Sequence, residues 1–278
     1  MAYSNNDVLT FYSYFNGNTE AYGVTEVGEV VNGKAQSKSR LVYDTLSPAV
    51  IQKHLNGQIS IGIAPIRSDG TCYWGAIDID DYKYNIQDII AAIDDFDIPL
   101  VPCYSKSRKL HLYIFFTDPV PAADVKALLQ WYIMAFACEK KTEIFPKQTK
   151  AHETQSFYSW INIPYFDAEN TENHRKVVTS KGIVDFSTAL DIIDKRRLSY
   201  EEHKAWINNF TYHDAPPCIL SGLLLRDIGP GKRNNWLFSV GVYLQLRDEN
   251  CDLKTELEQI NSSLKEPLPE SELNNTVI

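Results

Sequence analysis

The sequence predicts an α+β fold class, in which a mixed α/β domain is followed by a small all-helical domain, and three observations support this prediction. Up to about residue 185, short runs rich in β-branched and aromatic residues alternate with helical apolar patterns. Beyond that residue, helical patterns follow one another with no strand pattern between them. The five cysteines are scattered and include no Cys-x-x-Cys pair, which argues against a disulfide framework and against structural zinc. We therefore expect two domains, residues 1–185 and 186–278.

The first domain is expected to alternate strands with helices. A helix begins at Ser47, a residue type that caps helices, and Asn56 and Gly57 end it. Apolar residues at helical spacing from Ile86 to Phe96 predict a second helix. The expected helices cover residues 47–55, 86–96 and 122–138, and the expected strands cover residues 59–66, 74–80, 100–104, 110–116 and 157–166.

The second domain is expected to be helical throughout. Ser187 is a candidate cap for a helix over residues 188–197, and Ser199 with Glu202 forms a capping box that begins the next helix. Further helices are expected after Pro216-Pro217 and at residues 233–246, 252–264 and 270–278. The last pattern stops after two turns, so we expect a longer parent chain, with a natural end as the alternative.

Two aspartates alternate with apolar residues on the strand at 74–80. Ile77 and Ile79 are expected to point into the core, which leaves Asp78 and Asp80 on the other face, about 7 Å apart. Like charges at this distance repel each other unless a cation lies between them, and two divalent ions about 4 Å apart suit such a pair. The alternative is an exposed strand end, because Asp-x-Asp is a common string.

His111 begins the strand at 110–116, on the face opposite to Leu112 and Ile114. The turn before it, Ser105-Lys-Ser-Arg-Lys109, carries hydroxyl and amino groups that can donate to phosphate oxygens. The alternative is a structural histidine whose hydrogen bonds are made within the core. A third carboxylate, Glu143, precedes another short extended segment and can complete a metal site; the alternative is an edge segment with a surface lysine.

Taken in this order, the motifs resemble those of the archaeo-eukaryotic primase (primase-polymerase) superfamily, in particular the branch found in phage primases and in TOTE conflict systems. The resemblance extends over almost the whole chain, and several strings at family-like spacing are more specific than any one of them. The strings are Phe11 to Gly17, Ala21 to Gly23, Ile61 to Arg67, Cys72 to Asp80, Ser105 to His111, Glu143 to Gln148 and Trp160 to Phe166.

The resemblance implies an RRM-like catalytic domain that acts as a DNA primase-polymerase. The activity would be template-directed nucleotidyl transfer on single-stranded DNA with two Mg²⁺ or Mn²⁺ ions and dNTP or NTP substrates. The catalytic residues that it implies are Asp78, Asp80, Glu143 and His111, with the three carboxylates as metal ligands. The nucleotide-binding residues that it implies are Ser105, Ser107, His111, Lys147 and Gln148.

The chain departs from the family between the serine and the histidine. Relatives usually have small residues there, whereas this chain has Arg108, Lys109 and Leu110, which puts the efficiency of primer initiation in question. The helical region resembles the domain that follows the catalytic core in these primases, which is associated with initiation and often leads to a helicase. Candidate nucleic-acid-binding residues are Lys150, Arg196, Arg197, Lys232, Arg233 and Asn234, with solvated faces and helix caps as the alternative.

The charge balance argues against tight binding of nucleic acid. With 36 acidic and 27 basic residues the formal net charge is −9, so any template binding is expected to be weak and salt-dependent.

No secretory signal and no apolar run of about 20 residues is present, so we expect a cytoplasmic protein without a membrane partner. Two alternatives remain, a metal-dependent nuclease and a non-catalytic RRM-like module that stacks bases on Tyr113 and Phe115.

Overall fold

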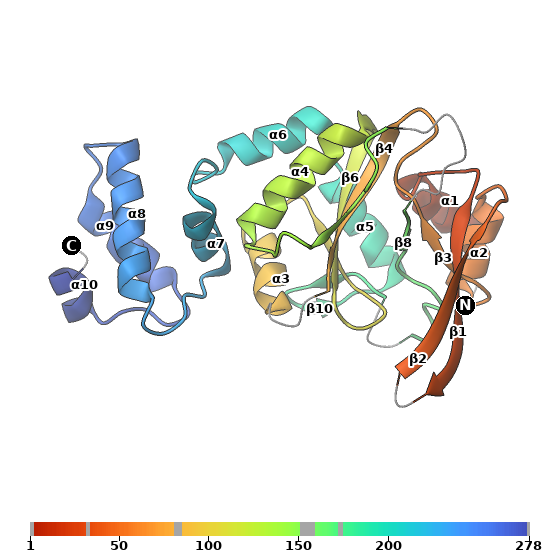
Figure 1. Ribbon diagram of the computed structural model, residues 1–278, viewed down its shortest axis with the longest axis horizontal. Coiled ribbons are helices and arrows are strands. Elements are labelled where there is room, and N and C mark those ends of the chain that lie inside the picture. The colour runs from red at the N-terminus through yellow and green to blue at the C-terminus, as the bar shows by residue number, and fades with distance from the viewer. Residues whose placement is uncertain (1–2, 32–33, 81–84, 151–158, 172–174, 277–278) are drawn as a thin grey trace.

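The computed structural model describes residues 3–31, 34–80, 85–150, 159–171 and 175–276. Figure 1 shows two β-sheets with helices around them on one side, and a succession of helices that leads away to the C-terminus on the other. The mixed α/β region followed by a helical region that the sequence predicts is therefore confirmed.

The first sheet is antiparallel and has the strand order β2-β1-β3-β8. Its strands are β1 (Tyr22–Val31), β2 (Lys34–Val42), β3 (Ser60–Ile63) and β8 (Ile161–Asn162). The expected strand at 59–66 is thus shorter than predicted, and that at 157–166 is reduced to β8, with residues 157 and 158 outside the described ranges. Two helices, α1 (Asn5–Tyr14) and α2 (Pro48–Leu55), pack against each other and share a buried core with this sheet.

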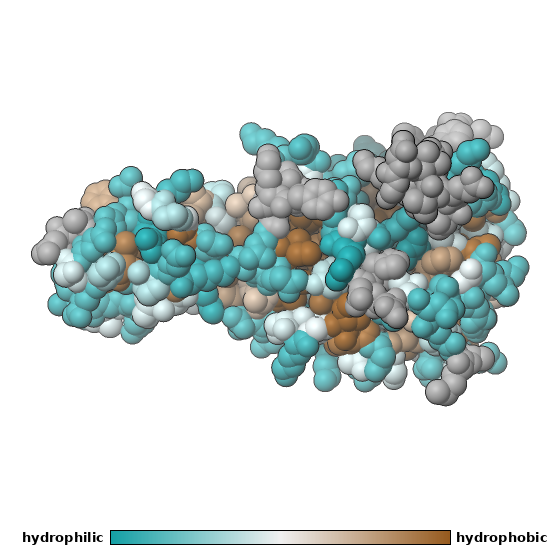
Figure 2. Space-filling model, turned by 90° about the horizontal axis from the view of Figure 1, so that it is seen from below, coloured by the Kyte–Doolittle hydropathy of each residue, from teal (hydrophilic) through white to brown (hydrophobic). Residues whose placement is uncertain are grey.

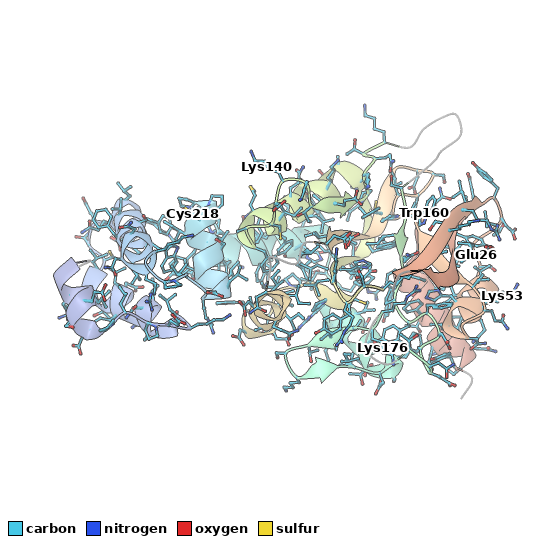
Figure 3. The ribbon with its side chains drawn as sticks, turned by 60° about the horizontal axis from the view of Figure 1, so that its bottom comes forward. Glu26, Lys53, Lys140, Trp160, Lys176 and Cys218 are labelled. Carbon is cyan, nitrogen blue, oxygen red and sulfur yellow. The ribbon has the colours of Figure 1, made fainter. Side chains whose placement is uncertain are left out.

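The indole of Trp160 packs against two glycines of the first sheet. Gly23 and Gly62 face each other across β1 and β3. A Cβ atom added at either glycine would lie only 2.1 or 2.3 Å from the indole of Trp160, the residue that leads into β8 (Figure 3). Neither glycine has a positive φ, so these positions require glycine for space rather than for backbone conformation.

The second sheet, antiparallel with the order β5-β6-β4-β7, has both faces buried. Its strands are β4 (Thr71–Ile79), β5 (Val101–Tyr104), β6 (Leu110–Pro121) and β7 (Glu143–Phe145). Leu112 and Ile114 point into one core and Tyr113 and Phe115 into the other, as the alternation predicts. The last two side chains are each 1% exposed, so the expectation that they stack on bases is wrong: they pack against aromatic rings of the core instead.

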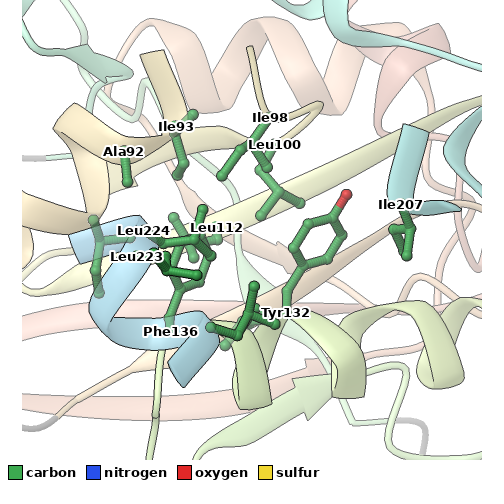
Figure 4. Close-up of a cluster of buried hydrophobic side chains, with 14 of the residues drawn as sticks. Ala92, Ile93, Ile98, Leu100, Leu112, Tyr132, Phe136, Ile207, Leu223 and Leu224 are labelled. Atoms are coloured by element: carbon green, nitrogen blue, oxygen red, sulfur yellow. The ribbon is translucent and has the colours of Figure 1, made fainter. Parts of the chain in front are cut away.

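Helices from distant parts of the chain meet on the Leu112 face of the second sheet (Figure 4). Ile93 comes from α3 (Ile86–Asp95) and Tyr132 from α4 (Ala122–Ala135), two helices that the sequence predicts. Ile207 of α6 (Tyr200–Asn209) and Leu223 of α7 (Pro217–Leu225) join the same cluster. The core of the first domain therefore continues into the helical region.

The helical region begins with a cap that differs from the predicted one. Asp185, rather than Ser187, caps α5 (Phe186–Arg196), because its carboxylate accepts a hydrogen bond from the backbone N–H of Thr188 at 2.8 Å. The capping box of Ser199 and Glu202 at the start of α6 is confirmed. The remaining elements are α8 (Arg233–Arg247), α9 (Leu253–Ser263), α10 (Glu270–Thr276), and the small hairpin of β9 (Val178–Thr179) and β10 (Gly182–Ile183).

The boundary expected after residue 185 stays a prediction. α5 contacts α1 and the second sheet, and His203 of α6 donates a hydrogen bond from Nε2 to the Phe115 carbonyl at 3.0 Å, so both helices pack on the first domain. Figure 2 shows that the far helices present a mainly hydrophilic surface on this side, with apolar residues scattered among polar ones. No helix within the described residues combines the length and apolarity that crossing a membrane requires.

Candidate active site

Three predicted site residues lie in one row across the second sheet. The strand register places Asp78 of β4 opposite His111 of β6 on one side and opposite Glu143 of β7 on the other. Neighbouring strands are about 4.8 Å apart, so these residues are direct neighbours although the chain separates them widely. Asp80 follows immediately after the end of β4. Ile77 and Ile79, which alternate with the two aspartates along the chain, are buried, as the alternation predicts.

The imidazole of His111 is held in one orientation by a buried tyrosine. The Tyr113 hydroxyl donates to the backbone carbonyl of Asn162 at 3.0 Å, and His111 Nδ1 lies 3.1 Å from the same hydroxyl oxygen. Because the hydroxyl has only one hydrogen, Nδ1–H is the donor to the tyrosine oxygen. Burial raises the pKa of Tyr113 well above its usual value and keeps it a donor. The other ring nitrogen, Nε2, is left 3.3 Å from Asp78 Oδ1.

Two of the three carboxylates, Asp80 and Glu143, are paired with lysines. Lys109 Nζ lies 3.4 Å from Asp80 Oδ1, and Lys147 Nζ lies 2.6 Å from Glu143 Oε1. With the side chains in these positions, no group of three or more His, Cys, Asp or Glu residues among those described converges closely enough to hold a metal ion. Each ion pair draws its carboxylate toward its lysine, so metal binding at this row requires Asp80 and Glu143 to exchange the lysines for the ion.

Asp78 provides the observation that favours a cation. Its Oδ1 atom is buried and accepts no hydrogen bond from a described residue, although His111 Nε2 is within ion-pair distance. A buried carboxylate oxygen without a donor is costly, and a divalent cation would satisfy it. Asp78, Asp80 and Glu143 supply oxygen ligands, which Mg²⁺ and Mn²⁺ prefer, so this donor set fits these ions.

A cavity beside the row, here called the basic pocket, opens between the end of the second sheet and β8. Its lining includes Asp80, Ser105, Lys106, Ser107, His111, Asn162 and Arg175. The turn that supplies its hydroxyls is closed by two hydrogen bonds, from Ser105 N to the Lys109 carbonyl at 2.8 Å and from Lys109 N to Ser105 Oγ at 3.1 Å. Arg108 and Lys109 do not line the cavity, so their bulk does not narrow it.

Arg175 is the residue of this pocket that the sequence analysis missed. The segment 175–177 runs beside β5, where Tyr104 N donates to the Lys176 carbonyl at 2.9 Å. This pairing brings the guanidinium, which belongs to a residue only 5% exposed, to the same cavity as the turn at 105–107. No local pattern marks Arg175, because its position depends on pairing between segments about seventy residues apart.

A second cavity, here called the acidic pocket, lies on the other side of the row. Its lining residues are Asp78, Asp80, Glu139, Lys141, Thr142 and Glu143. Asp80 lines both cavities. Lys141 pairs with Glu139 at 3.0 Å, which leaves this pocket richer in carboxylates than in cations.

Two predicted nucleotide-binding residues do not line the basic pocket. Lys147 is paired with Glu143, and its ammonium group lies 5.1 Å from the ring centroid of Phe145. The side-chain amide of Gln148 is bonded to Ser159, to which it donates at 3.2 Å and from which it accepts at 3.3 Å. The structure therefore places Lys147 beside Glu143, one of the predicted metal ligands, and gives Gln148 a contact with the segment before β8.

The predicted nucleic-acid-binding residues are dispersed, and several have partners within the protein. Arg196 pairs with Asp94 at 2.6 Å and donates to the Leu100 carbonyl at 2.8 Å, so it ties α5 to α3. The other pairs are Arg197 with Asp194, Arg233 with Glu266 and Asn234 with Glu272. Lys150 and Lys232 are exposed. Binding of nucleic acid by any of these residues stays a prediction.

Comparisons with known proteins agree with the order of the motifs. Residues 16–195 match the family model described as the archaeo-eukaryotic primase domain of TOTE conflict systems, and residues 221–278 match the model described as primase C terminal 1. A solved structure, the archaeo-eukaryotic primase domain of the primase-polymerase of cyanophage S-2L, is similar at 13% identity and a TM-score of 0.34, over 69% of this chain and 100% of that chain. No curated protein matches the chain. The first matched range contains the complete row and both pockets.

Proposed function

On the premise that this chain belongs to the TOTE conflict-system family of archaeo-eukaryotic primase domains and carries a primase C-terminal region, we propose that it is a DNA primase-polymerase. In this reaction the 3′-oxygen of a primer or of an initiating nucleotide attacks the α-phosphate of the incoming nucleotide. The bond from the α-phosphorus to the bridging oxygen breaks, and pyrophosphate leaves.

The observation that carries the proposal is the row of Asp78, His111 and Glu143 between a basic and an acidic pocket. Nucleotidyl transfer needs cations on the phosphates and carboxylates that hold divalent ions at the reacting phosphorus. The row supplies the carboxylates, and the basic pocket beside it supplies the cations, Lys106 and Arg175. A nuclease would use the same carboxylates, but it has no need for the hydroxyl and amino groups that line the basic pocket.

The residues of the chain have distinct tasks in this reaction. Asp78, Asp80 and Glu143 hold the divalent ions, which when bound neutralise charge on the triphosphate and lower the pKa of the attacking hydroxyl. His111 donates from Nε2 to the phosphates when its ring carries a proton on both nitrogens, since Nδ1–H already donates to Tyr113, which keeps Nε2 turned to the pocket. Ser105 and Ser107 donate to phosphate oxygens from the turn before His111.

Synthesis on a labelled single strand, with and without a primer and with dNTPs and NTPs in separate reactions, tests the proposal. We expect Mn²⁺- or Mg²⁺-dependent lengthening of the primer, or new products on the unprimed strand. Shortening of the strand would identify a nuclease, and metal-independent binding without any change in length would identify a binding module.

Single-stranded DNA is the proposed template, bound weakly because of the net charge of −9. A footprint of three or four phosphates gives a log–log salt slope of about −2 to −3, from about −0.7 per phosphate on single strands. Mn²⁺ added together with a nonhydrolysable nucleotide should raise template affinity in fluorescence anisotropy, because Mn²⁺ neutralises the charges of Asp78, Asp80 and Glu143. A helicase, in the parent chain or as a partner, stays a prediction.

A further inference from the structure

Helix α8 has apolar side chains on two faces, and the protein covers only one of them. The residues of the covered face, which pack on α7 and α9, are Trp236, Leu237, Val240, Gly241 and Leu244. Phe238, Val242 and Leu246, here called the α8 stripe, are 58%, 42% and 84% exposed. A helix that is apolar on several sides is normally buried on all of them, so we expect a further surface to cover the α8 stripe.

The α8 stripe is a continuous surface. Residues four apart are neighbours on a helix, so its three side chains extend over about 12 Å along the axis. The other large hydrophobic side chains that are exposed in the described ranges, Leu9, Tyr43 and Met134, come from three separate parts of the chain. The exposed positions of α8 beside the stripe are the uncharged residues Asn235, Ser239 and Gln245. A surface without charge fits an apolar partner rather than a phosphate backbone, which requires cations.

The charges at the ends of α8 have the wrong sign for the helix itself. Lys232 is its N-cap, and Asp248, its C-cap, is followed by Glu249; all three are exposed. A helix dipole favours anions at the N-terminus and cations at the C-terminus. Arg247 has the favourable sign and donates to the Thr211 carbonyl. Lys232 and Glu249 have no side-chain partner among the described residues, so both are available to another molecule.

We propose that the α8 stripe is the contact between two copies of this chain, whose α8 helices pair antiparallel about a two-fold axis beside Val242. Val242 then faces Val242 of the second copy, and Phe238 meets Leu246, because both lie four residues from the axis. Lys232 comes close to Glu249 and to the C-terminal carbonyls of the second copy's α8, where a cation is favourable. A parallel pair would bring like charges together at both ends, so the charges select the antiparallel arrangement.

The size of the contact predicts a weak dimer. α8 has 15 residues, and a single pair of such helices buries less than the roughly 1,200 Å² of the smaller specific interfaces. We therefore expect a dissociation constant on the order of 50 µM. Figure 1 shows α8 apart from both sheets, and no residue of α8 lines the basic or the acidic pocket. The dimer is thus independent of the proposed function.

Sedimentation equilibrium of the full chain at about 5 to 200 µM, a range that brackets this constant, tests the inference. The wild type should pass from monomer to dimer. Val242→Glu should weaken the dimer at least about 10-fold, because two like charges face each other across the axis. Leu9→Glu, at a side chain of α1 that is 53% exposed, is the matched control and should associate like the wild type. Thermal unfolding checks that each variant is folded, and Leu246→Glu replaces Val242→Glu if the latter is not.

A charge exchange tests the antiparallel arrangement. Lys232→Glu and Glu249→Lys should each weaken the dimer by about 3-fold, since an exposed ion pair is lost at both ends. The two changes together should restore the affinity to within about 2-fold of the wild type. Lys232 and Glu249 lie at opposite ends of one helix, about 25 Å apart, so they cannot compensate each other within a single copy.

The outcomes that overturn the inference are distinct. A wild type that stays monomeric up to about 200 µM, or a dimer that folded Val242→Glu leaves unchanged, overturns the pairing through the α8 stripe. A monomer whose α8 stripe binds a different protein identifies another occupant and overturns it as well. Failure of the combined variant to restore affinity overturns the antiparallel arrangement. Absence of primer extension by the wild type would contradict the proposed function and leave the dimer standing.

Discussion

The basic pocket and the acidic pocket share Asp80 and differ in the charges that line the rest of each cavity. The charged residues that only one of them has are Lys106, His111 and Arg175 in the basic pocket, and Asp78, Glu139, Lys141 and Glu143 in the acidic pocket. A chain with a net charge of −9 thus keeps a cavity lined by basic groups next to one that is rich in carboxylates. The overall charge of the protein says little about what its site binds, because charges are separated within a few ångströms.

The difference between the pockets depends on which segments reach each side of β4. The turn between β5 and β6 and the segment 175–177 supply the cations, whereas β4 itself and the segment leading into β7 supply the carboxylates. Lys109 pairs with Asp80 and Lys147 pairs with Glu143, so a lysine neutralises each of these carboxylates while no divalent ion is bound.

The largest expected effect is a loss of primer extension when two carboxylates of the acidic pocket are removed. Asp78→Ala with Asp80→Ala should lower the rate of primer extension by at least about 10³-fold, because divalent ions at the reacting phosphates contribute several kcal/mol. The fold should remain intact, and the unfolding temperature in metal-free buffer should be unchanged or higher, since two like charges are removed. Asp118→Ala, at an exposed carboxylate of β6, is the matched control. Wild-type extension by the double variant would place the metal site elsewhere.

The second prediction concerns His111, which lines the basic pocket. His111→Ala should weaken nucleotide binding by about 10- to 150-fold, which corresponds to a lost charge-assisted contact of about 1.5–3 kcal/mol, and should affect template binding less. Equilibrium binding of a fluorescent nucleotide measures the effect. Tyr113→Phe keeps the ring and removes only the hydroxyl that orients the imidazole, so a smaller loss is expected. Nucleotide affinity that does not change in His111→Ala would make His111 a structural histidine.

A third prediction uses a histidine outside both pockets. Burial lowers the pKa of His203 to about 4, although its hydrogen bond to the Phe115 carbonyl raises it in part. The folded protein therefore keeps His203 neutral, while the unfolded chain takes up a proton as the pH falls through about 6.5. The free energy of unfolding should fall by about 2 kcal/mol from this residue alone between pH 7 and pH 5.

Denaturant unfolding at pH 7 and pH 5 checks this prediction, with His203→Gln as the comparison. The variant should show a smaller loss of stability between the two pH values, whatever its stability at pH 7. An equal loss in both proteins would mean that other groups account for the acid sensitivity.

The smallest expected effect concerns the ion pair that Lys109 forms with Asp80, the residue that lines both pockets. Lys109→Met should raise Mn²⁺ affinity by about 2- to 5-fold, because a half-exposed pair of this kind contributes about 0.5–1 kcal/mol and the ion no longer competes with it. Electron paramagnetic resonance of free Mn²⁺ measures the affinity without substrate. Lys109→Arg keeps the charge and should bind Mn²⁺ like the wild type; equal affinity in all three proteins would remove Lys109 from the metal site.

Local patterns were sufficient for much of the fold and for naming three residues that the structure places in one row, Asp78, His111 and Glu143. The alternation at residues 74–80 and 110–116 predicted which side chains of β4 and β6 share a face of the sheet, and the capping box at Ser199 predicted the start of α6. Such patterns act over a few residues, since side chains of a strand alternate and the first turn of a helix needs acceptors for its N–H groups. The cap of α5 was assigned two residues too late. Ser187 and Asp185 are both residue types that cap helices, so a local pattern does not choose between them.

The sequence alone therefore determined most of the elements after residue 46, the Asp-x-Asp strand and the order of the motifs, since each depends on neighbouring residues, whereas α1, β1 and β2 were not predicted. Only the tertiary structure decided that Asp78 lies between His111 and Glu143, that Tyr113 is buried and not available to bases, and that Arg196 is tied to Asp94. It also brought Arg175 to the turn at 105–107. These contacts depend on strand register and on packing between segments far apart in the chain, which no local pattern specifies.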